Sequence, residues 1–94
     1  MDAWELRFKR GSEVTWSEIE DECVLLHLST GRYYTLNEVG RFMWKSLDGK
    51  KSLSELHRSV IREYDVDEQS AKQDILEVVQ DLLKEGLLET DDKN

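Results

Sequence analysis

The first third of the chain has the hydrophobic pattern of β-strands. Trp4, Leu6 and Phe8 alternate with charged residues, which is the period of two expected of a half-buried strand. A second short extended segment is predicted at Val14–Trp16. The acidic run Glu18–Glu22, which contains one apolar residue, predicts a solvated loop.

The next two apolar segments, Cys23–Leu28 and Arg32–Leu36, predict a β-hairpin because the short linker between them ends in glycine. No strand is expected soon after the second segment, so its outer edge is predicted to be open. Successive residues of a strand face opposite sides. Because Leu36 is expected in the core, Tyr34 should face the core as well and Tyr33 should face away from it.

Helices are predicted in the rest of the chain, each with a residue that can cap its first turn. Asn37 can cap a helix from Glu38 to Leu47, which Gly49 would end. Ser52 and Glu55 form a capping box for a second helix. The apolar residues of these two helices are expected in the core or close to it: Val39, Phe42, Met43, Trp44, Leu47, Leu53, Leu56, Val60 and Ile61.

A third helix is predicted from Asp67, which can cap it, to about Glu85, where Gly86 supplies a left-handed stop. Its apolar residues fill an arc of roughly 160°, wider than a helix resting on one layer needs. These residues are Ala71, Ile75, Leu76, Val78, Val79, Leu82 and Leu83. One edge of the arc is therefore expected to line a surface groove. The alternative is a helix packed between two elements, without a groove.

Acidic residues lie beside one edge of this arc and would give the groove an acidic rim: Asp74, Asp81 and Glu85. The chain as a whole has a net charge of −8, and most of it falls in residues 62–94. This charge works against binding a polyanion such as DNA, and it suits a basic partner. The alternative is that the acids only keep the protein soluble.

With 94 residues the chain is long enough for one domain with a single core. Strands followed by three helices predict an α+β fold of the winged helix-turn-helix type, with N-terminal antiparallel strands and no internal repeat. We expect one domain over residues 1–94. Within it, Leu87–Thr90 should form a brief strand and residues 91–94 a frayed tail.

Candidate catalytic residues are few. His27 and His57 are the only histidines, and neither has the spacing of a metal ligand with the lone Cys23. His27 is expected on a sheet face, His57 on an exposed helix side, and Cys23 as a small half-buried residue. No nucleophile elbow or phosphate loop is present, so we expect no enzymatic activity, cofactor or metal. We also expect no membrane association and a cytoplasmic location, because neither a spanning segment nor a signal peptide is evident.

The most distinctive segment, residues 31–49, reads GRYYTLNEVGRFMWKSLDG. It is followed by Leu53–Leu56, Tyr64–Val66, Asp74-Ile75 and Leu82–Leu88. In order and spacing these motifs resemble the PqqD-like family, over roughly residues 14–88. The resemblance implies a winged-helix module that binds the leader segment of a ribosomally made precursor peptide. Such a module hands the precursor to a leader peptidase or another tailoring enzyme, such as a radical-SAM protein.

Two details favour one type within that family. The hairpin TGRYYTLN and the ending Gly86–Leu88 resemble the stand-alone partners of lasso-peptide biosynthesis. Leu87 stands where members for pyrroloquinoline quinone biosynthesis tend to carry an aromatic residue. That alternative is disfavoured but stays open.

The resemblance also implies a binding mode. The leader would add as a strand to the free edge of Arg32–Leu36 and place side chains in the groove of the third helix. The expected site residues are Arg32, Tyr33, Tyr34, Thr35, Leu36, Ala71, Asp74, Ile75, Val78, Asp81 and Leu82. A monomer or a weak homodimer paired through strand edges is expected. An alternative of another class, a winged-helix DNA-binding regulator, is disfavoured by the acids on the third helix.

Overall fold

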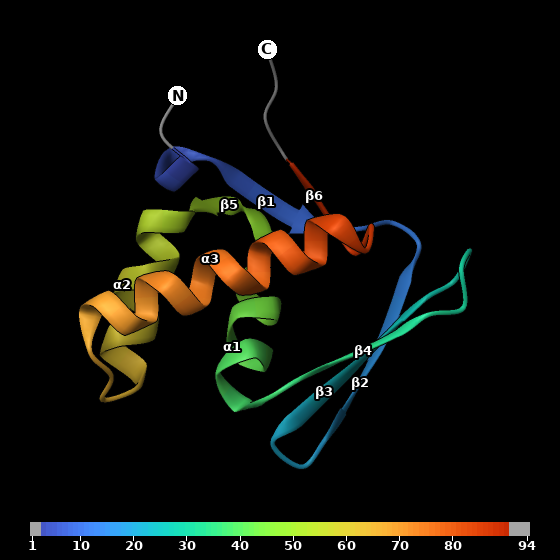
Figure 1. The fold of residues 1–94 in the computed structure, drawn as a ribbon, viewed down its shortest axis with the longest axis horizontal. Helices are drawn as coiled ribbons and strands as arrows, with labels where there is room; N and C mark the ends of the chain where they lie inside the picture. Colours follow the sequence, from blue (N-terminus) through green and yellow to red (C-terminus); the bar gives the residue numbers. More distant parts are fainter. Residues whose placement is uncertain (1–2, 91–94) are drawn as a thin grey trace.

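The computed structural model describes residues 3–90, which form two three-stranded antiparallel sheets and three α-helices (Figure 1). This confirms the predicted α+β arrangement. The elements in chain order are η1 (Ala3–Glu5), β1 (Arg7–Arg10), β2 (Val14–Ile19), β3 (Glu22–His27), β4 (Tyr33–Leu36), α1 (Glu38–Ser46), β5 (Asp48–Ser52), α2 (Leu53–Glu63), α3 (Glu68–Lys84) and β6 (Leu88–Thr90). The frayed tail expected at residues 91–94 lies outside the described residues.

The first sheet joins three distant parts of the chain around β1. This strand pairs antiparallel with β5 on one side and with β6 on the other. The short β6 confirms the predicted C-terminal strand. The sequence prediction lacks β5 and is wrong about Gly49, which lies within β5 at a φ of 84° instead of ending α1. It is also wrong about Trp4, which lies in the 3₁₀ turn η1 before the first strand.

The second sheet has the order β2-β3-β4 and contains the predicted hairpin, within one residue at each end. The prediction of a solvated loop at Glu18–Glu22 is wrong. β2 continues to Ile19 and pairs with Glu22 of β3, so only a two-residue turn remains, with Glu20 at a φ of 57°. The charge of Glu18 is accommodated in the strand because its carboxylate pairs with Arg41 and Lys45 of α1, at N···O distances of 2.8 and 3.2 Å.

The helix caps agree with the sequence prediction. The side chain of Asn37 accepts a hydrogen bond from Gly40 at the start of α1. Ser52 and Glu55 form the full capping box of α2, and the side chain of Asp67 caps α3. Each of these side chains satisfies a backbone donor that the helix itself leaves unpaired. The beginnings of all three helices are therefore fixed by local chemistry.

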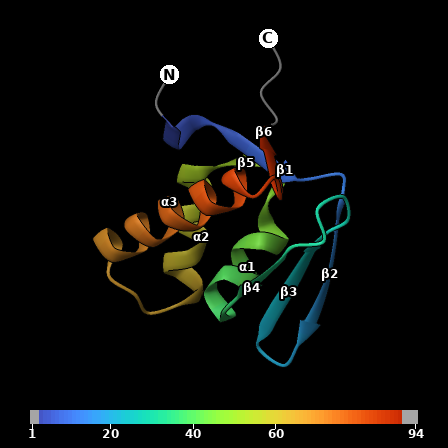
Figure 2. The same ribbon diagram turned by 45° about the vertical axis from the view of Figure 1, so that its right-hand side comes forward.

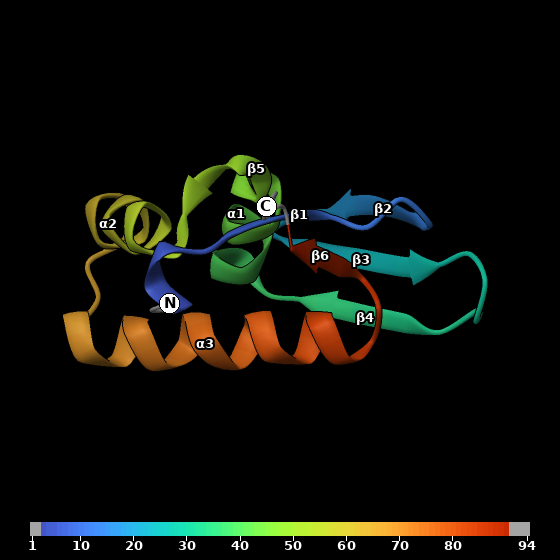
Figure 3. The same cartoon turned by 90° about the horizontal axis from the view of Figure 1, so that it is seen from above.

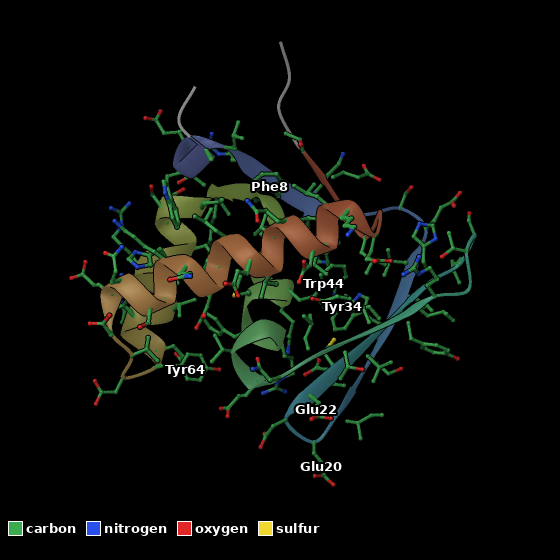
Figure 4. The ribbon with its side chains drawn as sticks, viewed as in Figure 1. Phe8, Glu20, Glu22, Tyr34, Trp44 and Tyr64 are labelled. Atoms are coloured by element: carbon green, nitrogen blue, oxygen red, sulfur yellow. The ribbon has the colours of Figure 1, made fainter. Side chains whose placement is uncertain are left out.

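The core is built around Trp44, whose side chain is fully buried (Figure 4). The rings of Trp44 and Trp16 of β2 meet edge-on. Both sheets and all three helices contribute buried apolar side chains: Phe8, Cys23, Leu25, Leu36, Met43, Leu47, Leu53, Leu56, Val60, Ala71, Ile75, Val79, Leu82, Leu87 and Leu88. The prediction for His57 is wrong. Its ring is buried, and Nε2 lies 3.1 Å from the carbonyl oxygen of Glu68, because α2 packs against the start of α3.

The arrangement leaves α3 along one side of the molecule and the second sheet extending from the helices (Figure 2). Viewed from above, β4 is the strand of that sheet that lies next to α3 (Figure 3). None of the helices within residues 3–90 is long and apolar enough to cross a membrane.

Candidate functional site

The outer edge of β4 is open. Within residues 3–90, β4 pairs with β3 alone and ends the β2-β3-β4 sheet. The amide of His27 donates to the carbonyl oxygen of Arg32 at 3.0 Å, which fixes the alternation of the ladder. Backbone groups of successive residues in an antiparallel strand point to opposite sides. The N–H and C=O of Tyr34 and Leu36 therefore face β3, and those of Tyr33 and Thr35 face the open edge.

The side chains of β4 divide as expected. Leu36 is 3% exposed and belongs to the core, and Tyr34 is half-buried on the same side. Tyr33 is 72% exposed on the other side, together with the exposed Thr35. A peptide that pairs with this edge would thus meet main-chain donors and acceptors from Tyr33 and Thr35.

Two side-chain contacts join β4 to the C-terminal half of α3. The hydroxyl of Tyr34 donates to Oδ2 of Asp81 at 3.0 Å, as the orientation of the ring toward α3 allows (Figure 4). Nε of Arg32, just before β4, lies 3.1 Å from Oε1 of Glu85. Burial and the bond to Asp81 raise the pKa of Tyr34, so the phenol stays protonated and keeps donating at neutral pH.

The N-terminal half of α3 lines two adjoining hollows, which together we call the α3 groove. One, of about 210 Å³, has an apolar lining from α1, α2, α3 and the loop before α3: Val39, Met43, Val60, Val66, Asp67, Ser70, Ala71, Asp74 and Ile75. The other, of about 250 Å³, is lined by Asn37, Val39, Gly40, Met43, Asp74, Glu77 and Val78. Three residues are shared, so the hollows form one path that starts at the end of β4.

The rim of the α3 groove is acidic. It carries Asp67, Asp74 and Glu77, all exposed, and no cation among residues 3–90 lines either hollow. One oxygen of Asp67 accepts the cap hydrogen bond from Ser70 at 3.0 Å, but the charge remains. This potential would repel the phosphates of a nucleic acid and attract a cationic side chain.

The structure separates the residues that were predicted on the α3 side of the site into three sets. Ala71, Asp74, Ile75 and Val78 line the α3 groove. Asp81 and Glu85, expected on the rim, are instead bonded to Tyr34 of β4 and to Arg32 just before it. Leu82 is fully buried in the core, so a peptide does not reach its side chain in this conformation.

Sequence reasoning missed the wall of the groove opposite α3. Val39, Gly40 and Met43 of α1 form this wall, and Val66 with Ser70 closes the end. The spacing of Val39 and Met43, one helical turn apart, was a signal for a shared face, but it did not distinguish a groove wall from core.

The described part of the chain offers little for catalysis or metal binding. No group of three histidine, cysteine or acidic side chains within it is placed to hold a metal ion. Burial raises the pKa of the Cys23 thiol and so works against a thiolate nucleophile. What the site can do is bind an extended chain, with an open strand edge, an apolar path and an acidic rim.

Comparison with known proteins finds a matching family model and two similar structures, both solved with a leader peptide. The family model described as coenzyme PQQ synthesis protein D (PqqD) matches residues 22–88. One similar solved structure is "TbiB1 in Complex with the TbiA(beta) Leader Peptide", whose sequence is 35% identical. The match covers 85% of this chain and 93% of the TbiB1 chain, with a TM-score of 0.76. "Lasso peptide synthetase B1 complexed with the leader peptide", at 24% identity, covers 87% and 96% with a TM-score of 0.76, and shows a shared fold. No curated relative matches the sequence.

Proposed function

Because the chain belongs to the PqqD family, we propose that it recognises the leader segment of a ribosomally synthesised precursor peptide. The observation that carries this proposal is the path from the open edge of β4 into the α3 groove. The similar TbiB1 was solved with a leader peptide, which supports the same class of ligand for this chain.

The open edge would supply affinity that is independent of the leader's sequence. A leader strand pairing with β4 would bond to the exposed backbone groups of Tyr33 and Thr35. Each backbone hydrogen bond contributes about 0.5–1.5 kcal/mol after exchange with water. Edge pairing alone is therefore a weak interaction and requires a second source of binding energy.

The α3 groove would supply that energy and the specificity. Its lining includes four buried apolar residues, each at most 4% exposed: Met43, Val60, Ala71 and Ile75. An apolar leader side chain seated there would gain about 1.5–3 kcal/mol from burial. The acidic rim would favour a lysine or arginine next to that side chain and would disfavour an acidic one.

The role we propose is delivery without catalysis. Binding one end of the precursor raises its effective concentration at a separate tailoring enzyme. We propose a leader peptidase of lasso-peptide biosynthesis, acting in the cytoplasm, as that enzyme. The TGRYYTLN hairpin and the 35% identity to TbiB1 support this type over a role in pyrroloquinoline quinone biosynthesis.

The test mixes the precursor and the peptidase encoded beside it, both at dilute concentration, with and without this protein. Mass spectrometry follows leader removal, and calorimetry with the synthetic leader measures binding directly. We expect binding, faster processing when the protein is present, and no turnover by the protein alone. Turnover without the peptidase would contradict the non-catalytic role. Equal rates with and without the protein would contradict delivery, and no heat of binding would contradict leader recognition.

A further inference from the structure

The charge of the first sheet is opposite to that of the rest of the chain. β1 and β5 are four and five residues long, and together they hold five of the chain's 13 lysines and arginines but one of its 21 acids. The remainder of the protein is therefore strongly acidic. We call the exposed cations of these two strands, Arg7, Lys9, Lys50 and Lys51, the basic strip.

Arg10, the fifth cation of β1 and β5, has a structural role. Arg10 donates from Nη1 to the carbonyl oxygens of Trp44 and Lys45, at 2.9 and 3.2 Å, and its guanidinium lies over the ring of Trp16. By contrast, neither ammonium group of Lys50 or Lys51 makes a hydrogen bond or ion pair to another residue in the range 3–90. The fold uses Arg10 and leaves these two lysines to the solvent.

Unlike these two lysines, the acids near the basic strip accept hydrogen bonds from the backbone. A carboxylate oxygen of Asp48 accepts from the amide of Lys50 at 2.9 Å, and one of Glu89 accepts from the amide of Ser12 at 3.1 Å. Glu55 accepts from the amide of Ser52 at 2.9 Å. These backbone bonds lower the pKa of Asp48 and of Glu55. Each acid therefore has a local structural task, so the ammonium groups of Lys50 and Lys51 are the part of this surface that the fold does not explain.

The basic strip and the α3 groove lie at opposite ends of α1. Val39, near the start of this nine-residue helix, lines the groove, and β5 begins two residues after the helix ends. A helix of this length spans about 14 Å. Figure 3 looks down on β1, β5 and β6, whereas α3 runs along the side of the molecule. A leader in the groove would leave the strip accessible.

We infer that the basic strip docks an acidic surface segment of the enzyme that receives the precursor. This inference rests on the proposed function, because delivery requires a second binding face that stays open when the leader is bound. The remainder of the chain has a net negative charge and would repel such a segment, so the charge asymmetry sets the orientation of docking. A nucleic acid fits less well, because a long polyanion reaching the strip would also meet the acidic α3.

The test compares two double variants of equal charge change. Lys50→Gln with Lys51→Gln removes half of the strip, and Arg62→Gln with Lys84→Gln removes two exposed cations elsewhere. The first readout is an NMR titration of the ¹⁵N-labelled protein with a deca-glutamate peptide at low salt. We expect amide shifts centred on β1 and β5, and an affinity about 3- to 10-fold weaker in the strip variant only.

The second readout is leader removal by the peptidase encoded beside the precursor, as a function of the concentration of this protein. The strip variant should need about 3- to 10-fold more protein for half-maximal rate, with unchanged affinity for the synthetic leader. Equal behaviour of the two double variants in either readout overturns the inference. Strip-dependent sedimentation with anionic phosphatidylglycerol vesicles, without an effect on leader removal, also overturns it in favour of a membrane surface. A wild-type protein that does not bind the leader refutes the proposed function instead.

Discussion

Replacing Thr35 with proline tests whether a peptide strand pairs with the edge of β4. The amide of Thr35 points away from β3, so proline removes a donor from the open edge and none from the existing ladder. An edge strand tolerates proline in this position. The variant is therefore expected to fold, and the change acts on the surface that the leader would use.

The expected loss combines two effects. One missing hydrogen bond weakens binding by about 0.5–1.5 kcal/mol, and the acceptor that it leaves unpaired on the leader adds to this. The proline ring also occupies space where the incoming strand would lie. Together these effects predict a loss of about 1–3 kcal/mol, which corresponds to about a 5- to 150-fold increase in Kd.

Calorimetry with the synthetic leader measures this loss, and Thr35→Ala is the matched control. Alanine keeps the amide and removes only an exposed side chain on the outer face of the sheet. We expect Thr35→Ala to bind the leader like the wild type, and urea unfolding should show both variants folded. A folded proline variant with wild-type affinity, or an alanine variant as weak as the proline variant, would refute pairing at this edge.

Further predictions concern the groove and the acidic clusters. Ser70→Phe should fill the apolar hollow that Ser70 lines and weaken leader binding by about 1.5–3 kcal/mol, whereas Gln73→Phe, on the solvent side of α3, should not; equal affinities in calorimetry would remove this hollow from the site. Replacing the rim acids Asp67, Asp74 and Glu77 with their amides should slow leader association and flatten the salt dependence of the association rate in stopped-flow measurements. The same replacement of three exposed acids elsewhere, Glu5, Glu22 and Glu63, is the control and should change neither. Lys45 and Arg41 lower the pKa of Glu18, so its contribution to stability is present above the ordinary glutamate pKa and is lost as pH falls through the folded value. Glu18→Gln should therefore lose less stability than the wild type between pH 5 and 3 in urea titrations, and parallel losses would contradict the ion pairs.

Local signals in the sequence were enough to predict most of the elements. The caps Asn37, Ser52 and Asp67 and the stop at Gly86 each act within a few residues, and the structure has all four as expected. β5 could not be predicted in the same way. Its sequence, DGKKS, contains no apolar side chain, and it becomes a strand only because β1, far away in the chain, supplies its hydrogen-bond partners.

The sequence predicts the α3 side of the candidate site but not the opposing wall formed by α1. The periodicity of α3 predicts that Ala71, Ile75 and Val78 share one side of the helix, and all three line the α3 groove. The opposing wall depends on where α1 lies relative to α3, and nothing local encodes that arrangement. His57 shows the same limit, since its burial results from the approach of the start of α3.

Two acids at the C-terminal end of α3, Asp81 and Glu85, bond to Tyr34 and Arg32 and therefore differ in role from the acids on the rim of the α3 groove. The Arg32–Glu85 pair is largely exposed on the arginine side, at 69%, and such pairs contribute little. The hydroxyl of Tyr34, a half-buried residue, donates to Asp81 and makes the second connection. It holds the C-terminal half of α3 at β4, while the N-terminal half lies against α2 and leaves the α3 groove open in advance of binding. A leader would then meet a groove that is already formed, which reduces the entropic cost of ordering it. On this argument Asp81 fixes the geometry of the site, and the charge that a basic leader encounters is that of Asp67, Asp74 and Glu77.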